Sequence, residues 1–132
     1  MANPNIVSVT SILGETTYLT PSATTSVILL PNAASSGKVY KINQIVAANV
    51  DGASAVNTTV VIYTDGSVAQ GSASSGGTAY PIVSTISVPV DASLIVADKT
   101  TAIYLMEDKS IVVTSGTASK IAYTISYEVI ED

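Results

Sequence analysis

The sequence lacks five residue types that carry much of protein chemistry: cysteine, histidine, arginine, tryptophan and phenylalanine. Without cysteine there is no disulfide, no thiolate metal site and no cysteine nucleophile. Without histidine the chain has neither the commonest general base nor a Ser-His-Asp triad. Without arginine it has no bidentate clamp for phosphate. These absences argue against an enzyme, and we expect no catalytic residue, no cofactor and no bound metal.

Charge is also scarce. Charged residues make up 11% of the 132 residues, against about 25% in an average soluble domain. Five lysines face ten acidic residues, and the lysines are spread along the chain, so we expect no nucleic-acid partner. The longest apolar run, at 27–31, is far short of the ~18 residues of a membrane span, and we expect no membrane partner. The first residues lack the pattern of a secretory signal, which favours assembly in the cytoplasm.

The residues that are abundant favour strands. Serine, threonine, valine, isoleucine and tyrosine fit a pleated, half-buried surface. The clearest strand covers residues 120–131, where large apolar side chains alternate with small or polar ones. We expect its buried face to hold Ile121, Tyr123, Ile125 and Tyr127, with Thr124 and Ser126 opposite.

Further strands follow between turn signals. The expected ranges are 6–13, 16–20, 25–30, 39–50, 58–64, 81–88, 93–96, 101–106 and 110–114. In the strand 39–50, strict alternation predicts one face made of Tyr40, Ile42, Gln44, Val46, Ala48 and Val50. This pattern predicts an all-β, single-domain antiparallel β-sandwich, either jelly-roll or immunoglobulin-like. We divide the chain into an extended N-terminal segment, 1–20, and a sandwich domain, 21–132.

Several segments read as turns and loops. Asp51 and Asp65 each precede glycine and are expected to form turns. Residues 66–78 are rich in glycine and serine, and we expect them to form a mobile loop with few apolar contacts. The acidic residues form no calcium-loop motif and no evident pair for acid-base chemistry.

The N-terminal segment is apolar and extended, which makes it the candidate contact region. We expect it either to pair within its own sheet as an edge strand or to add to a neighbouring subunit as an assembly arm. The candidate assembly-contact residues are Ile6, Val7, Val9, Ile12, Leu13 and Tyr80.

The low charge also bears on function, because a surface of serine, threonine and alanine is suited to being covered by a neighbour. The alternatives are a structural subunit of a larger assembly, an ordinary soluble β domain, and a glycan- or receptor-binding module that uses tyrosines and the glycine-serine loop.

Seven stretches of the sequence resemble a family of small β-rich virion structural proteins of tailed bacteriophages, notably marine cyanophages. They are 1–7 (MANPNIV), 36–43 (SGKVYKIN), 49–52 (NVDG), 86–89 (ISVP), 91–96 (DASLIV), 99–105 (KTTAIYL) and 125–128 (ISYE). The chain departs from the family pattern by its long loop at 66–78 and by Glu107–Ser110 in place of an acidic Glu-x-Gly-Asp turn.

The resemblance implies a non-enzymatic β-sandwich carried on the phage particle. We expect a capsid decoration or cement protein that binds the outer surface of the major capsid lattice, with the major capsid protein or other virion proteins as partners and with self-association. The alternative within the virion is a neck, tail or fibre subunit.

Overall fold

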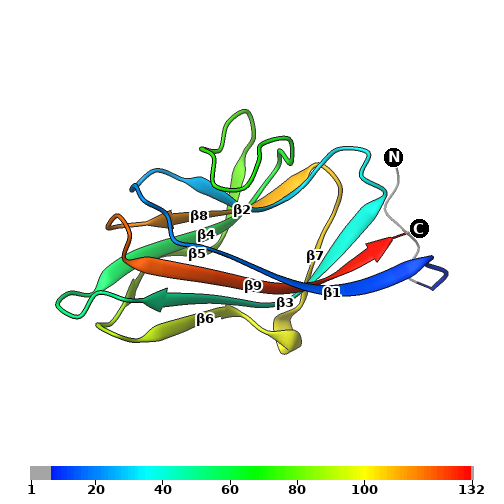
Figure 1. Cartoon of the computed structure of the whole chain (residues 1–132). Helices are drawn as coiled ribbons and strands as arrows, with labels where there is room; N and C mark the ends of the chain where they lie inside the picture. Colours follow the sequence, from blue (N-terminus) through cyan, green and yellow to red (C-terminus); the bar gives the residue numbers. More distant parts are fainter. Residues whose placement is uncertain (1–6, 132) are drawn as a thin grey trace.

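A computed structural model describes residues 7–131, which form two antiparallel sheets packed face to face (Figure 1). Within these residues, strands account for all the regular structure except one short 3-10 helix, η1 (Lys99–Thr101). The strands are β1 (Ser11–Leu19), β2 (Val27–Asn32), β3 (Lys38–Asn49), β4 (Val56–Tyr63), β5 (Ala79–Val88), β6 (Ser93–Ala97), β7 (Ile103–Leu105), β8 (Lys109–Ser115) and β9 (Ile121–Glu131). The predicted β-sandwich is therefore confirmed.

The order of the strands is that of a jelly roll. The first sheet, sheet A, runs β1-β9-β3-β6, with β7 also paired to β3, and the second, sheet B, runs β2-β8-β4-β5. If β6 and β7 are counted as one strand interrupted by η1, the pairs are first with eighth, second with seventh, third with sixth and fourth with fifth. This is one long hairpin folded over on itself, the jelly-roll alternative of the two expected.

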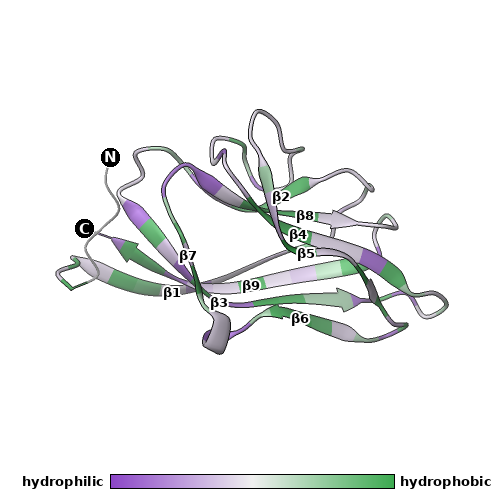
Figure 2. Cartoon of the chain, turned by 180° about the vertical axis from the view of Figure 1, so that it is seen from behind, coloured by the Kyte–Doolittle hydropathy of each residue, from purple (hydrophilic) through white to green (hydrophobic). Residues whose placement is uncertain are grey.

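The core lies between the two sheets, and β9 confirms the predicted alternation. Ile121, Tyr123, Ile125 and Tyr127 are buried, whereas Thr124 and Ser126 on the opposite face are partly exposed. The Tyr123 hydroxyl crosses the core, where it donates to the carbonyl of Thr114 at 3.0 Å and pairs with the Thr58 hydroxyl. Apolar segments of both sheets accordingly face each other in Figure 2.

Strand β3 corrects the predicted face. Its register with β9 passes from Ile42 opposite Tyr127 directly to Gln44 opposite Ser126, so Asn43 is the extra residue of a β-bulge. Beyond the bulge the faces exchange: Ile45 is fully buried, while Gln44 is exposed. The expected grouping of Gln44, Val46 and Ala48 with Ile42 is wrong because strict alternation does not anticipate the bulge.

The glycine-serine loop 66–78 lies against the outer face of sheet B. Val68 packs against a small apolar cluster on the outer face of sheet B, formed by Ile28, Val61, Tyr63 and Val112. The loop is tied to β2, since the Ile28 N–H donates to the Ser72 carbonyl at 3.0 Å and the Gly71 N–H donates to the Ile28 carbonyl at 2.9 Å. Figure 1 shows it in green over β2. Val68 is the loop residue that packs against this cluster, in keeping with the expected scarcity of apolar contacts, and the backbone hydrogen bonds to β2 are contacts that the composition does not indicate.

Two buried asparagines fasten the loops at the ends of the sandwich. Asn49 donates to the carbonyls of Ser54, Val88 and Pro89 at 3.0–3.2 Å, and its side-chain oxygen accepts from the Asp51 N–H. Asn32 donates in the same way to the carbonyls of Lys38 and Leu105. No local sequence pattern indicates either role.

The turn predictions hold at both aspartates. The Asp51 side chain accepts from the Ala53 N–H, and the Asp65 side chain accepts from the Ser67 N–H at 2.8 Å.

The strand expected at 101–106 is shorter in the structure, because Thr101 belongs to η1 and β7 begins at Ile103. Within residues 7–131 no helix is long and apolar enough to cross a membrane.

Candidate functional site

The two sheets leave four strand edges at the sides of the sandwich. Sheet A ends at β1 on one side and at β6 and β7 on the other, and sheet B ends at β2 and β5. Strand β1 lies beside β2, and β5 lies beside β6. Each edge carries backbone groups that can pair with another chain, so the structural protection of each edge indicates where a partner strand could bind.

The edge of β2 is partly covered by the chain itself. Ala73 forms an antiparallel bridge with Val27, and the Ser74 N–H donates to the Ser26 carbonyl at 3.2 Å. With the two hydrogen bonds at Ile28, residues 71–74 act as an additional short strand. These residues occupy the first part of the edge, Ser26–Ile28, and Pro31 near its end has no N–H to donate to a partner strand.

The opposite edges are protected by irregularity. Strand β5 has two register shifts against β4, contains Pro81, and places Thr85 at a φ of 50°. Proline removes a donor, and bulges twist an edge away from a neighbour. Strands β6 and β7 are only five and three residues long and are separated by η1, so neither offers a long ladder.

Strand β1 has none of these protections. It pairs with β9 over nine residues without a register shift, and it contains no proline. Three large apolar side chains on it are exposed: Ile12 by 58%, Leu13 by 55% and Tyr18 by 75%. Such a long, regular edge favours the addition of a further strand.

The far end of β1 is partly occupied. The Gln70 side chain donates to the Thr17 hydroxyl at 2.9 Å and approaches the Tyr18 carbonyl at 3.4 Å. Along Ser11–Thr16, no other segment of residues 7–131 hydrogen-bonds to the backbone on the open side. The open edge is therefore residues 11–16.

The single charge of β1 is engaged by the core. Glu15 accepts a hydrogen bond from the Tyr127 hydroxyl at 2.9 Å, and the Tyr127 ring packs against that of Tyr40 with centroids 5.1 Å apart. Burial raises the pKa of Tyr127, and the hydrogen bond to Glu15 and its charge raise this pKa further. Burial also raises the pKa of Tyr40, and the charges of Glu15 and Glu131 add to the effect. Tyr127 therefore stays protonated and holds the Glu15 side chain in place by this hydrogen bond.

The structure separates the sequence-predicted contact residues. Ile12 and Leu13 lie together on β1, Val7 is exposed and Val9 is half-buried, whereas Ile6 lies outside the described residues. Tyr80 is exposed on β5, across the sandwich from β1, so it does not share one surface with Ile12 and Leu13.

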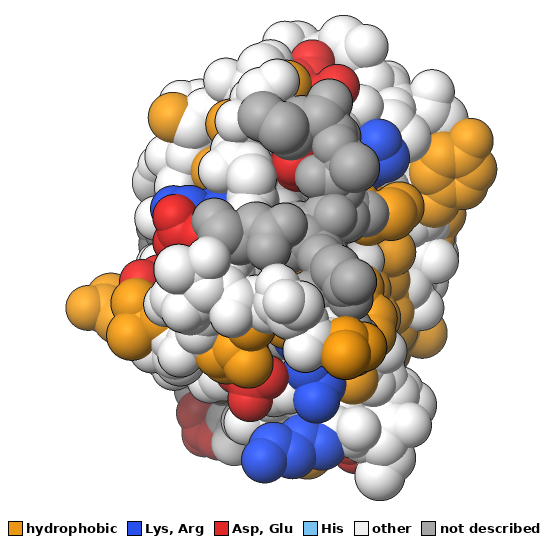
Figure 3. All heavy atoms as spheres, turned by 90° about the vertical axis from the view of Figure 1, so that its right-hand side faces the viewer, with side chains coloured by type: hydrophobic (Ala, Val, Ile, Leu, Met, Phe, Trp, Pro, Cys, Tyr) orange, Lys and Arg blue, Asp and Glu red, His pale blue; other side chains and the backbone are white. Residues whose placement is uncertain are grey.

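Figure 3 views the end of the sandwich at which β1 begins and shows hydrophobic side chains along both margins.

Tyr18 is an edge residue that the sequence pattern alone does not assign to the contact region, and its place on the apolar N-terminal strand is the signal that could have identified it.

Among the described residues, no three acidic side chains are gathered as a metal-binding group. No protein-family model matches the chain, and the search of curated proteins finds no match either.

Proposed function

We propose that this protein is a structural subunit that joins a larger assembly by adding a partner strand to β1. The observation that carries the proposal is the contrast between the edges: β1 is long, regular and open, whereas β2 is partly covered and β5 is irregular. A partner strand along residues 11–16 would complete the backbone hydrogen bonds on the open side of β1.

The same contact would bury apolar surface. Ile12 and Leu13 point to opposite faces of β1, so a strand beside them contacts both side chains. At about 25 cal/mol per Å², two half-exposed aliphatic side chains contribute roughly 1–3 kcal/mol before the ordering of the partner is counted. The backbone hydrogen bonds would set the orientation of the partner strand along β1, and the burial of the two side chains would contribute part of the binding free energy.

The assembly that we propose is the virion of a tailed phage, with the protein on the outer capsid surface and the major capsid protein as its partner. The sequence resemblance supports this choice, and so does the net charge of −5, since a subunit that faces packaged DNA would meet phosphate repulsion. A neck, tail or fibre subunit would use the same edge. Quantitative mass spectrometry of purified virions separates the two, because a shell protein matches the capsid lattice in copy number and a neck protein matches a single ring.

A matched pair of substitutions tests the edge. Ile12 and Ile95 are both 58% exposed, lie on the outer face of sheet A, and occupy its two opposite edges, β1 and β6. Ile12→Lys places a charge of the kind that blocks edge pairing on the proposed contact, and Ile95→Lys places it on the other edge.

The readout is the loading of each variant onto particles stripped of the protein. We expect Ile12→Lys to lose loading and Ile95→Lys to retain it, while both keep the melting temperature of the parent. Equal loading of the two variants would contradict the role of β1, and loss of loading with Ile95→Lys alone would place the contact on the other side.

A further inference from the structure

The two outer faces of the sandwich differ. The loop 66–78 covers one end of the outer face of sheet B, around Val61 and Tyr63, whereas among residues 7–131 no comparable loop crosses the middle of the outer face of sheet A. Two adjoining hollows of ≈ 500 and ≈ 310 Å³ occupy that middle and share Asn43 and Ser126. Together they form a groove that runs from η1 over β3 and β9 to β1, and we call it the sheet A groove.

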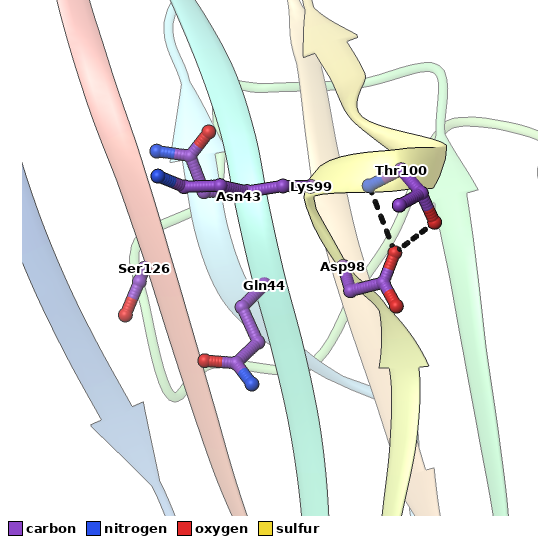
Figure 4. Close-up of a pocket in the computed structure, with 6 residues that line it drawn as sticks. All are labelled: Asn43, Gln44, Asp98, Lys99, Thr100 and Ser126. Atoms are coloured by element: carbon purple, nitrogen blue, oxygen red, sulfur yellow. Dashed lines mark hydrogen bonds between the residues drawn. The ribbon is translucent and has the colours of Figure 1, made fainter.

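Small side chains and the bulge explain why the surface is hollow there. Gly14 on β1 and Ser126 on β9 form part of the lining, and a Cβ added to Gly14 would meet no atom within 4 Å. The bulge at Asn43 increases the local twist of β3. At the other end, η1 stands beside β3 and provides a wall (Figure 4).

The groove carries polar groups that the fold does not use. The carboxamides of Asn43 and Gln44 and the ammonium group of Lys99 make no hydrogen bond to any of the described residues. Figure 4 shows the Lys99 side chain reaching from η1 across β3 to lie beside Asn43, with Gln44 next along the strand. The Ser126 and Thr16 hydroxyls bond each other at 3.0 Å and complete the polar lining.

The charges along the groove argue against an anionic ligand. Lys99 is preceded by Asp98, whose pKa is lowered by hydrogen bonds from the Thr100 hydroxyl and N–H, so it remains a carboxylate. Glu15 and Glu128 line the β1 end of the groove. An anion would therefore meet more negative than positive charge, whereas a neutral ligand avoids this repulsion.

The donors and acceptors suit a ligand rich in hydroxyl groups. A carboxamide offers two donors and an acceptor at one position, and a hydroxyl can use both kinds. The groove crosses three strand spacings, which is about 14 Å at ~4.8 Å each. Because it crosses the strands, an extended peptide in it could not form a backbone ladder with them.

We propose that the sheet A groove binds an uncharged oligosaccharide. Asn43, Gln44 and Lys99 bond its hydroxyl groups, and Ser126 and Gly14 leave room for its rings. Tyr18 and Tyr104 stand exposed on the same face near the two ends, one on β1 beyond Thr16 and one on β7 opposite Lys41. Their rings provide apolar surface for sugar carbons. The β1 end of the groove includes Gly14 and Thr16, so it adjoins the proposed strand-addition edge, whereas Asn43, Gln44 and Lys99 lie away from that edge on β3 and η1.

Titration of the full chain by amide-detected NMR tests the groove. The probes are uncharged linear hexasaccharides of α-linked glucose, β-linked glucose, mannose and N-acetylglucosamine. We expect at least one to cause saturable shifts at the backbone amides of Gln44, Lys99 and Ser126 and at the side-chain amides of Asn43 and Gln44.

Three variants locate the site. Gln44→Ala and Lys99→Ala should each weaken binding by about tenfold, and Lys99 lies outside the sheet, so its replacement leaves the bulge intact. The matched control is Asn57→Ala, since Asn57 is an exposed carboxamide on β4 of sheet B, and it should change the Kd by less than about twofold.

Three outcomes would overturn the proposal. The first is the absence of saturable shifts with all four probes, and the second is a set of shifts confined to the 66–78 loop or to sheet B. The third is tighter binding of a sulfated hexasaccharide than of its uncharged parent at about 0.15 M salt, which would show an ionic site instead.

Discussion

The cover that the 66–78 loop places on sheet B can be tested with two valines. Val61 lies on β4 and points to the outer face of sheet B, where the loop leaves it 6% exposed. Val46 lies on β3 and points to the outer face of sheet A, where it is only partly buried. Both strands are central in their sheets, and the change to alanine removes the same atoms at each position.

The expected costs differ because only one valine is covered. Removing two buried carbons costs about 0.8 kcal/mol each in transfer free energy, and the cavity left under the loop adds to this. We therefore expect Val61→Ala to lower the free energy of unfolding by about 2 kcal/mol. At Val46 the removed carbons are partly solvated already, so Val46→Ala should cost less than about 1 kcal/mol.

Urea unfolding of the two variants and the parent measures the difference. With a slope of about 1–3 kcal/mol/M, a loss of 2 kcal/mol moves the midpoint by about 1 M. Hydrogen exchange gives an independent check, since the Gly71 N–H donates to the Ile28 carbonyl and should be protected. Equal losses in the free energy of unfolding for Val46→Ala and Val61→Ala, together with rapid exchange of the Gly71 amide, would refute the packing of the loop on sheet B.

Three further predictions concern the core and its ionisation. Ile125→Ala should lower the free energy of unfolding, measured with urea, by about 2–4 kcal/mol, and Thr124→Ala should lower it by less than about 1 kcal/mol. The difference is expected because only Ile125 is fully buried. Equal losses for the two variants would contradict the alternation of β9. Asn49→Ala should cost at least about 2 kcal/mol, since it leaves three carbonyls without their donor, and a neutral result would show that water replaces the amide. Burial raises the pKa of Tyr123 from 10.0 to about 12, so its contribution to stability is present below pH 10 and is lost as the pH rises towards about 12. Unfolding measured across this range should show the loss, which Tyr123→Phe should reduce, and an unchanged slope in that variant would assign the loss to Tyr127 or other groups.

Sequence alone predicts most strands because their signals are local. The alternation in β9 runs without interruption from Ile121 to Val129, and its buried face follows from the period of two. The turns at Asp51 and Asp65 follow from aspartate before glycine. The choice between jelly roll and immunoglobulin-like sandwich depends on long-range pairing, which no local pattern contains.

The failures have a common physical cause, which is long-range pairing. Asn43 is a polar residue that would be acceptable in a regular strand, and only pairing with β9 makes it a bulge and turns Ile45 inward. The loop 66–78 has the composition of a mobile linker, which gives no sign of the backbone hydrogen bonds that Gly71 and Ser72 form with Ile28 of β2. Composition describes side chains and does not report these backbone contacts.

The candidate site is predictable in part. The apolar pattern of the N-terminal residues is enough to select Ile12 and Leu13, which the structure places exposed on β1. The choice of β1 over the other strand edges depends on the structure. The bridge at Ala73 covers part of the β2 edge, and the register shifts of β5 make that edge irregular. The sheet A groove depends on the bulge at Asn43 and is not predictable for that reason.

Hydrogen exchange along β1, in the free protein and on assembled particles, tests the proposed strand addition most directly. In the free protein, the amides of residues 11–16 that face away from β9 should exchange rapidly, while those of β9 are protected on both sides by β1 and β3. On the particle, we predict that the open amides of 11–16 become as slow as those of β9. Particles that carry the protein while these amides continue to exchange rapidly would contradict strand addition at β1.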